Sequence, residues 1–333
     1  MTTMTHDAAV ADAPSRFGAG LLLALVSATA FGTSGALARG LIESGWSPGA
    51  AVTLRILVAA AVLVVPVALS LRGRWRTLLQ NARLVTGYGV GAVAGAQLCY
   101  FQAVARMDVG MALLIEYTAP VAVVLWLWLR RGERPGALTL AGAAVAALGL
   151  VLVLDLLSGG SLDPVGVLWA LGAMVGAASY FLLSADDSSG LPPLALVGGG
   201  LVVAGTGLGL ACLVGILPWA ASTSDVTFAV ATVPWWAPVV ALGVLAGAVS
   251  YLTGVAAARR LGSRLASFIA LTEVLAALAF AALLLNQVPS AVQLLGGAGV
   301  LAGVVLVKLG EPRPPITPEE GGAVAGALPV AGS

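Results

Sequence analysis

The stretch PGAAVTLRILVAAAVLVVPVALS, residues 48–70, is apolar along almost its whole length and contains a single charged residue, Arg55. A helix needs roughly 20 such residues to cross the hydrocarbon core of a bilayer. Pro48 opens the stretch and Arg72 follows its end. Because backbone polar groups cannot be left unpaired in lipid, we expect this stretch to form a transmembrane helix.

Similar stretches recur along the chain, which is 59% hydrophobic and only 9% charged. A soluble domain carries about 25% charged residues, so the exposed surface of this chain must face lipid. The pattern predicts an all-α polytopic membrane protein with ten transmembrane helices. The predicted spans are residues 17–38, 48–70, 84–105, 109–129, 136–156, 164–184, 192–218, 234–257, 265–285 and 289–307.

The basic residues predict the direction of these helices, because cytoplasmic segments carry an excess of Lys and Arg. With both termini in the cytoplasm, 13 of the 16 basic residues fall in cytoplasmic segments. The outer loops then hold only Arg39 and Arg106, and Arg55 lies within a span. We therefore expect a multi-pass protein of a bacterial inner membrane with cytoplasmic N- and C-termini.

The two ends of the chain differ from the rest in composition. Residues 1–15 are predicted to be a disordered arm, and residues 310–333, rich in Pro, Gly and Ala, a disordered tail. Between them, residues 16–156 and 157–309 are predicted to be two five-helix repeats.

The repeat is visible as an ungapped match of residues 117–153 to residues 271–307, in which Pro135 meets Pro289 and Gly142 meets Gly296. A loop three residues longer in the second copy would also match Tyr100 to Tyr251. Because five is an odd number, a repeat of five spans ends on the other side of the membrane. The second repeat must therefore enter the membrane in the direction opposite to the first. Inverted repeats are typical of secondary transporters, which bind their substrate between the repeats near the membrane midplane.

Three ionisable residues lie deep within the predicted spans: Arg55, Glu116 and Glu273. A charge at mid-bilayer costs at least about 2.5 kcal/mol, so each should face the protein interior. Counting from the helix starts places Arg55 and Glu116 at a similar depth in the outer half, which predicts an ion pair. The same count places Glu273 in the inner half.

The functional interpretation is that these residues bind a substrate, protons, or each in turn, since burial disfavours the charged form of a carboxylate. The alternative is a salt bridge that only joins helices. A secondary set of polar residues within the spans would line the cavity, or else form hydrogen bonds between helices. This set is Thr33, Ser34, Gln97, Tyr100, Tyr117, Tyr180 and Tyr251.

Several function classes are disfavoured by the sequence. The net charge of +1 gives no reason to expect a nucleic-acid partner. The single histidine, His6, lies in the predicted arm, so we expect no histidine-based metal site, and no cofactor is predicted. No nucleophile, base or metal constellation predicts a catalytic site, which leaves a membrane-embedded enzyme as a remote alternative.

Four short motifs resemble the drug/metabolite transporter superfamily, in its EamA branch. Phe31-Gly32-Thr33-Ser34, Thr53-Leu54-Arg55 and Leu271-Thr272-Glu273 match positions in helices one, two and nine of that family. Ile115-Glu116-Tyr117-Thr118-Ala119-Pro120 is similar to a motif of the bacterial threonine/homoserine exporter group. Val274 and Asn286-Gln287 depart from the usual Pro and Gly-Glu.

The resemblance implies a proton-coupled exporter of amino acids or related metabolites, whose partners are a small-molecule substrate, protons and the lipid bilayer. Drug efflux and metabolite uptake by the same fold stay open as alternatives, as does a channel. The oligomeric state is open too, with a homodimer among the alternatives.

Overall fold

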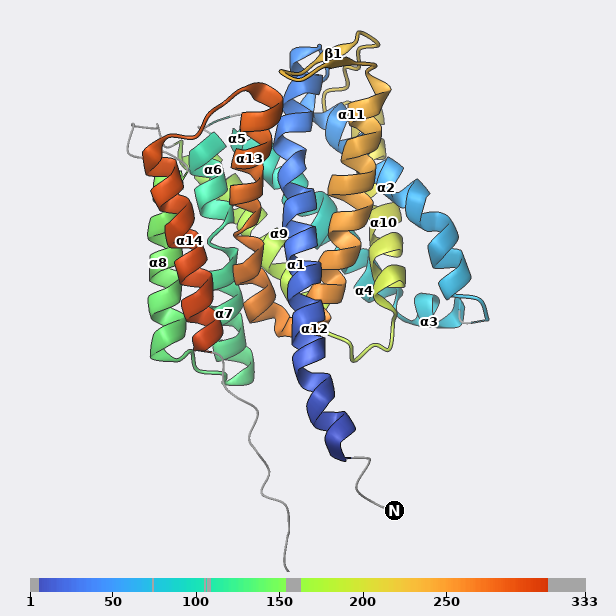
Figure 1. Ribbon diagram of the computed structural model, residues 1–333. Coiled ribbons are helices and arrows are strands. Elements are labelled where there is room, and N and C mark those ends of the chain that lie inside the picture. The colour runs from blue at the N-terminus through green and yellow to red at the C-terminus, as the bar shows by residue number, and fades with distance from the viewer. Residues whose placement is uncertain (1–5, 74, 105, 107–108, 154–162, 311–333) are drawn as a thin grey trace, which may run out of the picture.

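The chain folds almost entirely into helices that lie side by side in one bundle (Figure 1). This computed structural model describes residues 6–73, 75–104, 106, 109–153 and 163–310. The first part of the chain forms α1 His6–Glu43, α2 Pro48–Ser70, α3 Trp75–Gln80, α4 Ala82–Gly87, the π-helix η1 Tyr88–Gly95, α5 Ala96–Val104, α6 Val109–Glu116, α7 Ala119–Arg131 and α8 Ala137–Val153. The second part forms α9 Pro164–Ala185, α10 Pro193–Leu213, β1 Val226–Thr227, β2 Thr232–Val233, α11 Trp236–Ala241, the π-helix η3 Leu242–Val249, α12 Ser250–Ala270, α13 Glu273–Leu285 and α14 Ala291–Leu309.

Among the described residues, seven helical stretches are long and apolar enough to cross a membrane. They are Phe17–Glu43, Pro48–Ser70, Ala112–Arg131, Pro164–Ala185, Pro193–Leu213, Trp236–Ala270 and Ala291–Leu309. Two apolar helices, α8 and α13, are shorter. Large apolar side chains such as Leu129 and Leu213 stay exposed on the outside of the bundle, as a surface in contact with lipid requires. The chain is therefore a multi-pass helical membrane protein, and the number of ten spans stays a prediction.

The helix ends follow local sequence signals. Ser47 caps α2, its hydroxyl accepting a hydrogen bond from the backbone N–H of Ala50, and Pro48 takes the first helical position. Ser290 and Gln293 form a capping box at the start of α14. Gly132 ends α7 with a positive φ of 70°, a conformation that glycine adopts without steric cost.

The first helix differs from the sequence-based expectation. Residues 6–15, expected to belong to a disordered arm, continue α1, which begins at His6. The segment is rich in alanine, which has the highest intrinsic helix propensity, and it extends a stable transmembrane helix without a new nucleation step. Residues 1–5 and 311–333, which hold the remaining arm and almost all of the predicted tail, lie outside the described residues.

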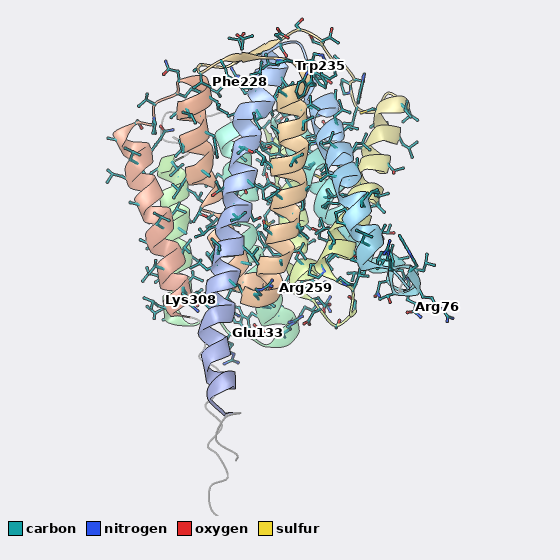
Figure 2. The ribbon with its side chains drawn as sticks, turned by 45° about the vertical axis from the view of Figure 1, so that its right-hand side comes forward. Arg76, Glu133, Phe228, Trp235, Arg259 and Lys308 are labelled. Carbon is teal, nitrogen blue, oxygen red and sulfur yellow. The ribbon has the colours of Figure 1, made fainter. Side chains whose placement is uncertain are left out.

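Two ends of the bundle can be told apart. The antiparallel hairpin of β1 and β2 covers one of them, which we call the hairpin end. Phe228 and Trp235 lie there, whereas Arg76, Arg259 and Lys308 lie at the opposite end, which we call the basic end (Figure 2).

From α4 onward in the first half and from α11 onward in the second, the two halves contain corresponding elements at a constant spacing of 154 positions. α7 begins at residue 119 and α13 at 273, and these helices end at 131 and 285. α8 begins at 137 and α14 at 291. The π-helices η1 and η3 span residues 88–95 and 242–249. The second copy therefore has no three-residue insertion between its third and fourth helices, and the expected match of Tyr100 to Tyr251 is wrong: Tyr251 corresponds to Gln97, and Tyr100 to Gly254.

Glycines bring α8 and α14 into backbone contact. A Cβ added at Gly142 would lie 2.7 Å from the carbonyl oxygen of Gly303, and one at Gly149 would lie 2.7 Å from that of Gly296. These contacts run in opposite order along the two helices, so the equivalent helices of the two halves pack antiparallel. Small residues permit such close approach, which drives association between helices in lipid.

We predict that Gly149→Val lowers the stability of the protein by about 1–3 kcal/mol, because its side chain forces α8 and α14 apart. Gly207→Val is the matched control: it places the same side chain in the middle of α10, where nothing lies within 4 Å of an added Cβ. Thermal unfolding in detergent should show a lower midpoint for Gly149→Val than for Gly207→Val. Equal midpoints for the two variants would contradict the packing argument.

Candidate functional site

A cavity of about 470 Å³ lies inside the bundle between the two halves of the chain. Its walls come from α1, α2, η1, α5, α6, α7, α9, η3, α12 and α13. Arg39, Ile42 and Pro48, near the junction of α1 and α2, line one end of it, and the side chains of Arg39 and Ile42 are exposed. The cavity therefore reaches the surface at this junction.

Two helix breaks flank the cavity at equivalent positions of the two halves. Tyr117 and Thr118 separate α6 from α7, and Leu271 and Thr272 separate α12 from α13. The Thr118 hydroxyl donates to the carbonyl of Ile115 at 2.6 Å, and the Thr272 hydroxyl donates to that of Ile269 at 2.7 Å. Such bonds from threonine to the preceding turn help to bend a helix.

Each break places a glutamate at the cavity. Glu116 is the last residue of α6, and Glu273 is the first residue of α13. Both line the cavity. Glu273 lies at a helix N-terminus, where the helix dipole favours a negative charge. The like charges of the two carboxylates act against each other. Both glutamates thus lie near the middle of the bundle.

Arg55 is buried in the wall of the cavity and is held by neighbouring helices. Its Nη1 donates to Ser34 Oγ at 3.0 Å, and its Nη2 donates to the carbonyl of Ala246 at 2.7 Å. Its guanidinium lies 5.6 Å from the centre of the Phe31 ring, within range of a cation–π interaction. Its Nε is buried without a hydrogen-bond partner.

The structure does not contain the expected ion pair of Arg55 with Glu116. Within the described residues the carboxylate that Arg55 attracts is that of Glu273. The sequence-based count treated the spans as unbroken helices perpendicular to the membrane, and it placed Glu273 apart from the other two charges. The paired breaks bring Glu273 toward Arg55, and no cation among the described residues pairs with Glu116.

Aromatic rings form a continuous part of the cavity wall. The Phe31 and Tyr251 rings meet edge to face with centres 5.0 Å apart, and the Tyr180 and Tyr251 rings do the same at 5.7 Å. Gln97 lines the same cavity as Tyr251. Rigid rings of this kind favour apolar parts of a bound molecule, while the few polar groups orient it.

Nine of the ten residues singled out from the sequence line this cavity, although their roles stay predictions. They are Ser34, Arg55, Gln97, Tyr100, Glu116, Tyr117, Tyr180, Tyr251 and Glu273. Thr33 does not: it faces a shallow apolar pocket beside Val249 and Phe280, and its hydroxyl donates to the carbonyl of Ala30. One helical residue turns about 100°, so Ser34 and Thr33 cannot share a face.

Sequence reasoning missed other residues of the wall. Phe31, Gly35 and Ser267 line the cavity and have no charge that would mark them in the sequence. The positions of Phe31 and Gly35 could have been found from the periodicity of α1, since these residues and Ser34 lie on one helical face. Within the described residues no group of three or more His, Cys, Asp or Glu side chains could hold a metal ion.

The sequence of this chain matches a known protein family. Residues 18–155 and 164–309 each match the EamA-like transporter family. A relative from Salmonella typhimurium, named "Uncharacterized inner membrane transporter YicL", is 24% identical over 166 residues. That match covers 48% of this chain and 55% of the relative, so the chain spans about half the length of the curated relative it matches.

A solved structure shares the fold. It is described only as the crystal structure of a protein, is 21% identical, and superposes with a TM-score of 0.71 over 88% of this chain and 97% of its own. The family matches cover both halves and almost all of the helical residues. The chain therefore belongs to the EamA-like transporter family and is a multi-pass membrane protein.

Proposed function

We propose that this chain is a secondary active transporter that carries a small polar metabolite through its central cavity by alternating access. The observation that carries the proposal is the pair of equivalent helix breaks, each with a glutamate, on the wall of one cavity. Broken helices at the interface of two repeats are the usual construction of substrate and ion sites in secondary transporters.

The proposed membrane topology is ten spans in two inverted five-helix repeats. The seven long stretches, the shorter helices α8 and α13, and the run α4–η1–α5 together account for ten crossings. The antiparallel packing of α8 and α14 supports the inversion, because equivalent helices of inverted copies run in opposite directions.

The proposed orientation places the basic end in the cytoplasm of a bacterial cell. The N-terminal end of α1, Arg76, Arg259 and Lys308 all lie at this end (Figures 1 and 2). An excess of basic residues on one side is the strongest determinant of membrane orientation. Both chain termini would then be cytoplasmic, and the cavity would reach the surface on the outer side.

The proposed substrate is an amino acid or a related amine, exported in exchange for protons. None of the described residues gives Glu116 a cation of its own in the cavity, so it can bind a substrate ammonium or a proton, one excluding the other. Such competition couples the two fluxes. Arg55, which lines the cavity, would orient a carboxylate, while the aromatic wall contacts the apolar part.

Drug efflux and metabolite uptake are the alternative functions of the same fold. Proteoliposomes loaded with single amino acids or amines, with and without a pH gradient, separate these functions by the direction of flux. Saturation of the flux separates a carrier from a channel.

We predict that Glu116→Gln reduces proton-driven transport by about tenfold or more, since a lost charged hydrogen bond is worth about 1.5–3 kcal/mol. Glu43→Gln is the chemically matched control, because Glu43 is exposed on α1 and does not line the cavity. Flux in proteoliposomes with equal amounts of protein is the measurement. Wild-type flux in Glu116→Gln would rule out the proposed role of this carboxylate.

We also predict that Gly35→Trp abolishes most of the transport while leaving the protein folded. Gly35 lines the cavity, and nothing lies within 4 Å of an added Cβ, so the indole would fill the cavity rather than displace a helix. Gly207→Trp, on the exposed face of α10, is the control and should transport normally. Substrate flux together with size-exclusion chromatography distinguishes blockage from misfolding, and unimpaired flux in Gly35→Trp would place the pathway elsewhere.

A further inference from the structure

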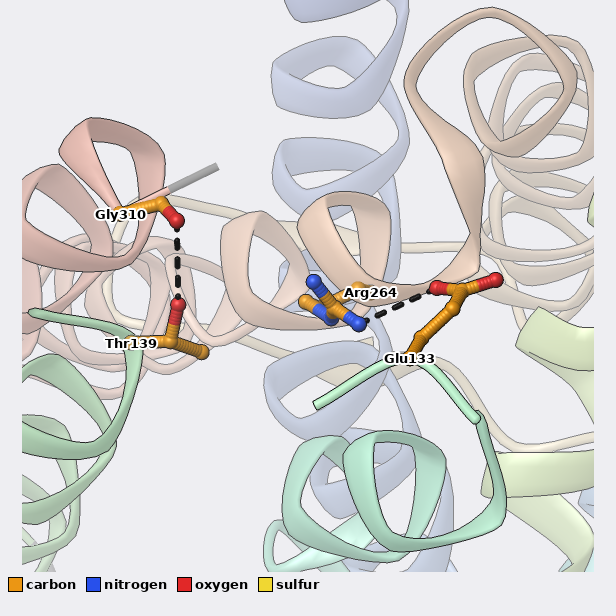
Figure 3. A network of polar contacts seen from close by, with 4 residues as sticks. All are labelled: Glu133, Thr139, Arg264 and Gly310. Atoms are coloured by element: carbon orange, nitrogen blue, oxygen red, sulfur yellow. Dashed lines mark hydrogen bonds and ion pairs between the residues drawn. The ribbon is translucent and has the colours of Figure 1, made fainter. Parts of the chain in front are cut away.

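One ion pair joins the two halves of the chain at the basic end. Arg264 Nη2 and Glu133 Oε2 lie 3.1 Å apart (Figure 3). Glu133 belongs to the turn after α7 in the first half, and Arg264 belongs to α12 in the second half. Arg264 is only 7% exposed, and its Nε is buried without a hydrogen-bond partner. Glu133 is therefore its compensating charge.

This pair lies beyond the end of the cavity that is lined by Ala257, Ala266 and Ser267, and because all three are buried we call this the closed end. Arg264 does not line the cavity, but Ala266 and Ser267, within one helical turn of it, do. The Ser267 hydroxyl donates to the carbonyl of Arg264 at 2.7 Å, which ties the pair to the cavity wall. Gly262, with a φ of 79°, interrupts the helical geometry just before this segment. The segment from Ser263 to Ala270 can therefore move as a short unit between Gly262 and the break at Leu271.

The opposite end of the bundle lacks the equivalent pair. At the spacing of 154 positions that relates the two halves, Arg264 corresponds to Gly110 and Glu133 to Gln287. Neither can carry a charge. The exposed ion pair Arg39–Glu43 lies within one helix and joins no two elements. Within the part of the chain that the structure describes, an ion pair between the halves is thus present at one end only.

We propose that Arg264 and Glu133 form a latch that holds the cavity closed at the basic end and that must open in every transport cycle. The latch favours the conformation in which the cavity reaches the hairpin end, because no matching pair stabilises the opposite conformation. Loss of Glu133 leaves a buried guanidinium uncompensated, which drives the Ser263–Ala270 segment toward water and opens the basic end.

The test measures which end of the cavity admits a thiol reagent. Cys99 and Cys212 are first replaced by Ser, and a single cysteine is introduced either as Ala266→Cys, at the closed end, or as Ala51→Cys, near the hairpin end. A membrane-impermeant maleimide is then applied to whole cells and to inside-out vesicles. Glu133→Gln and Arg264→Gln are compared with Asp187→Asn, which removes an exposed carboxylate from the loop after α9.

We expect Glu133→Gln to raise labelling of Ala266→Cys from the basic end by about tenfold and to lower labelling of Ala51→Cys from the other side. The reversed pair, Glu133→Arg with Arg264→Glu, should restore both rates, and Asp187→Asn should change neither. Unchanged labelling in folded Glu133→Gln protein overturns the latch. The latch is also overturned if the cysteines are labelled in the reversed pair at the same rates as in the single variants. Glu133 is nearly half exposed, so its substitution tests the proposal even if Arg264→Gln fails to fold.

The proposal that the latch opens in every transport cycle rests on the proposed function, alternating access. The proposal that the ion pair holds the basic end closed does not. Labelling requires no substrate, so the two proposals can fail separately. A chain with the labelling response but no flux would overturn the proposed function alone. Flux with no labelling response would overturn the latch alone.

Discussion

Lipid offers no hydrogen-bond partner to a peptide group, and the arrangement of this protein follows from that constraint. The helices that face lipid are continuous over long stretches. The two interruptions next to the glutamates lie where α6 meets α7 and where α12 meets α13, and residues on both sides of each line the cavity. Irregular backbone is tolerated at membrane depth only in such places.

A second level of organisation comes from side chains that are expensive to bury. Arg55 is tolerated because Ser34 and the carbonyl of Ala246 accept its hydrogen bonds and Phe31 covers its face. Arg264 is tolerated because Glu133 compensates it. The first arginine belongs to the cavity wall and the second to its closed end, so the two buried cations mark two different tasks. Among the described residues Glu116 has no such cation, and this is why the proposed function assigns the substrate or the proton to it.

Much of this was accessible from the sequence, because a charge inside an apolar stretch leaves few choices of location. Arg55, Glu116 and Glu273 were expected to face the interior, and all three line one cavity. Their partners were not predictable. Arg55 bonds to the carbonyl of Ala246, and a backbone acceptor leaves no signature in a sequence. The break at Leu271–Thr272 was not predicted, because position 274 holds Val and not the proline that would indicate a helix break. The register of Tyr251 was missed because identical side chains are weak evidence in a chain of such biased composition.

The contact between α8 and α14 has a consequence for how the two ends of such a protein can come to differ. Gly142 meets Gly303 and Gly149 meets Gly296, so each half presents the same patch to the other, as in an isologous dimer. Two separate, identical subunits could make that contact equally well. Such subunits could not, however, differ from each other. Any residue present in one would be present in both, and the two ends of the cavity would be identical. Covalent linkage of the halves removes this restriction. It lets one copy hold Arg264 where the other holds Gly110, and so lets a symmetric framework acquire an inside and an outside.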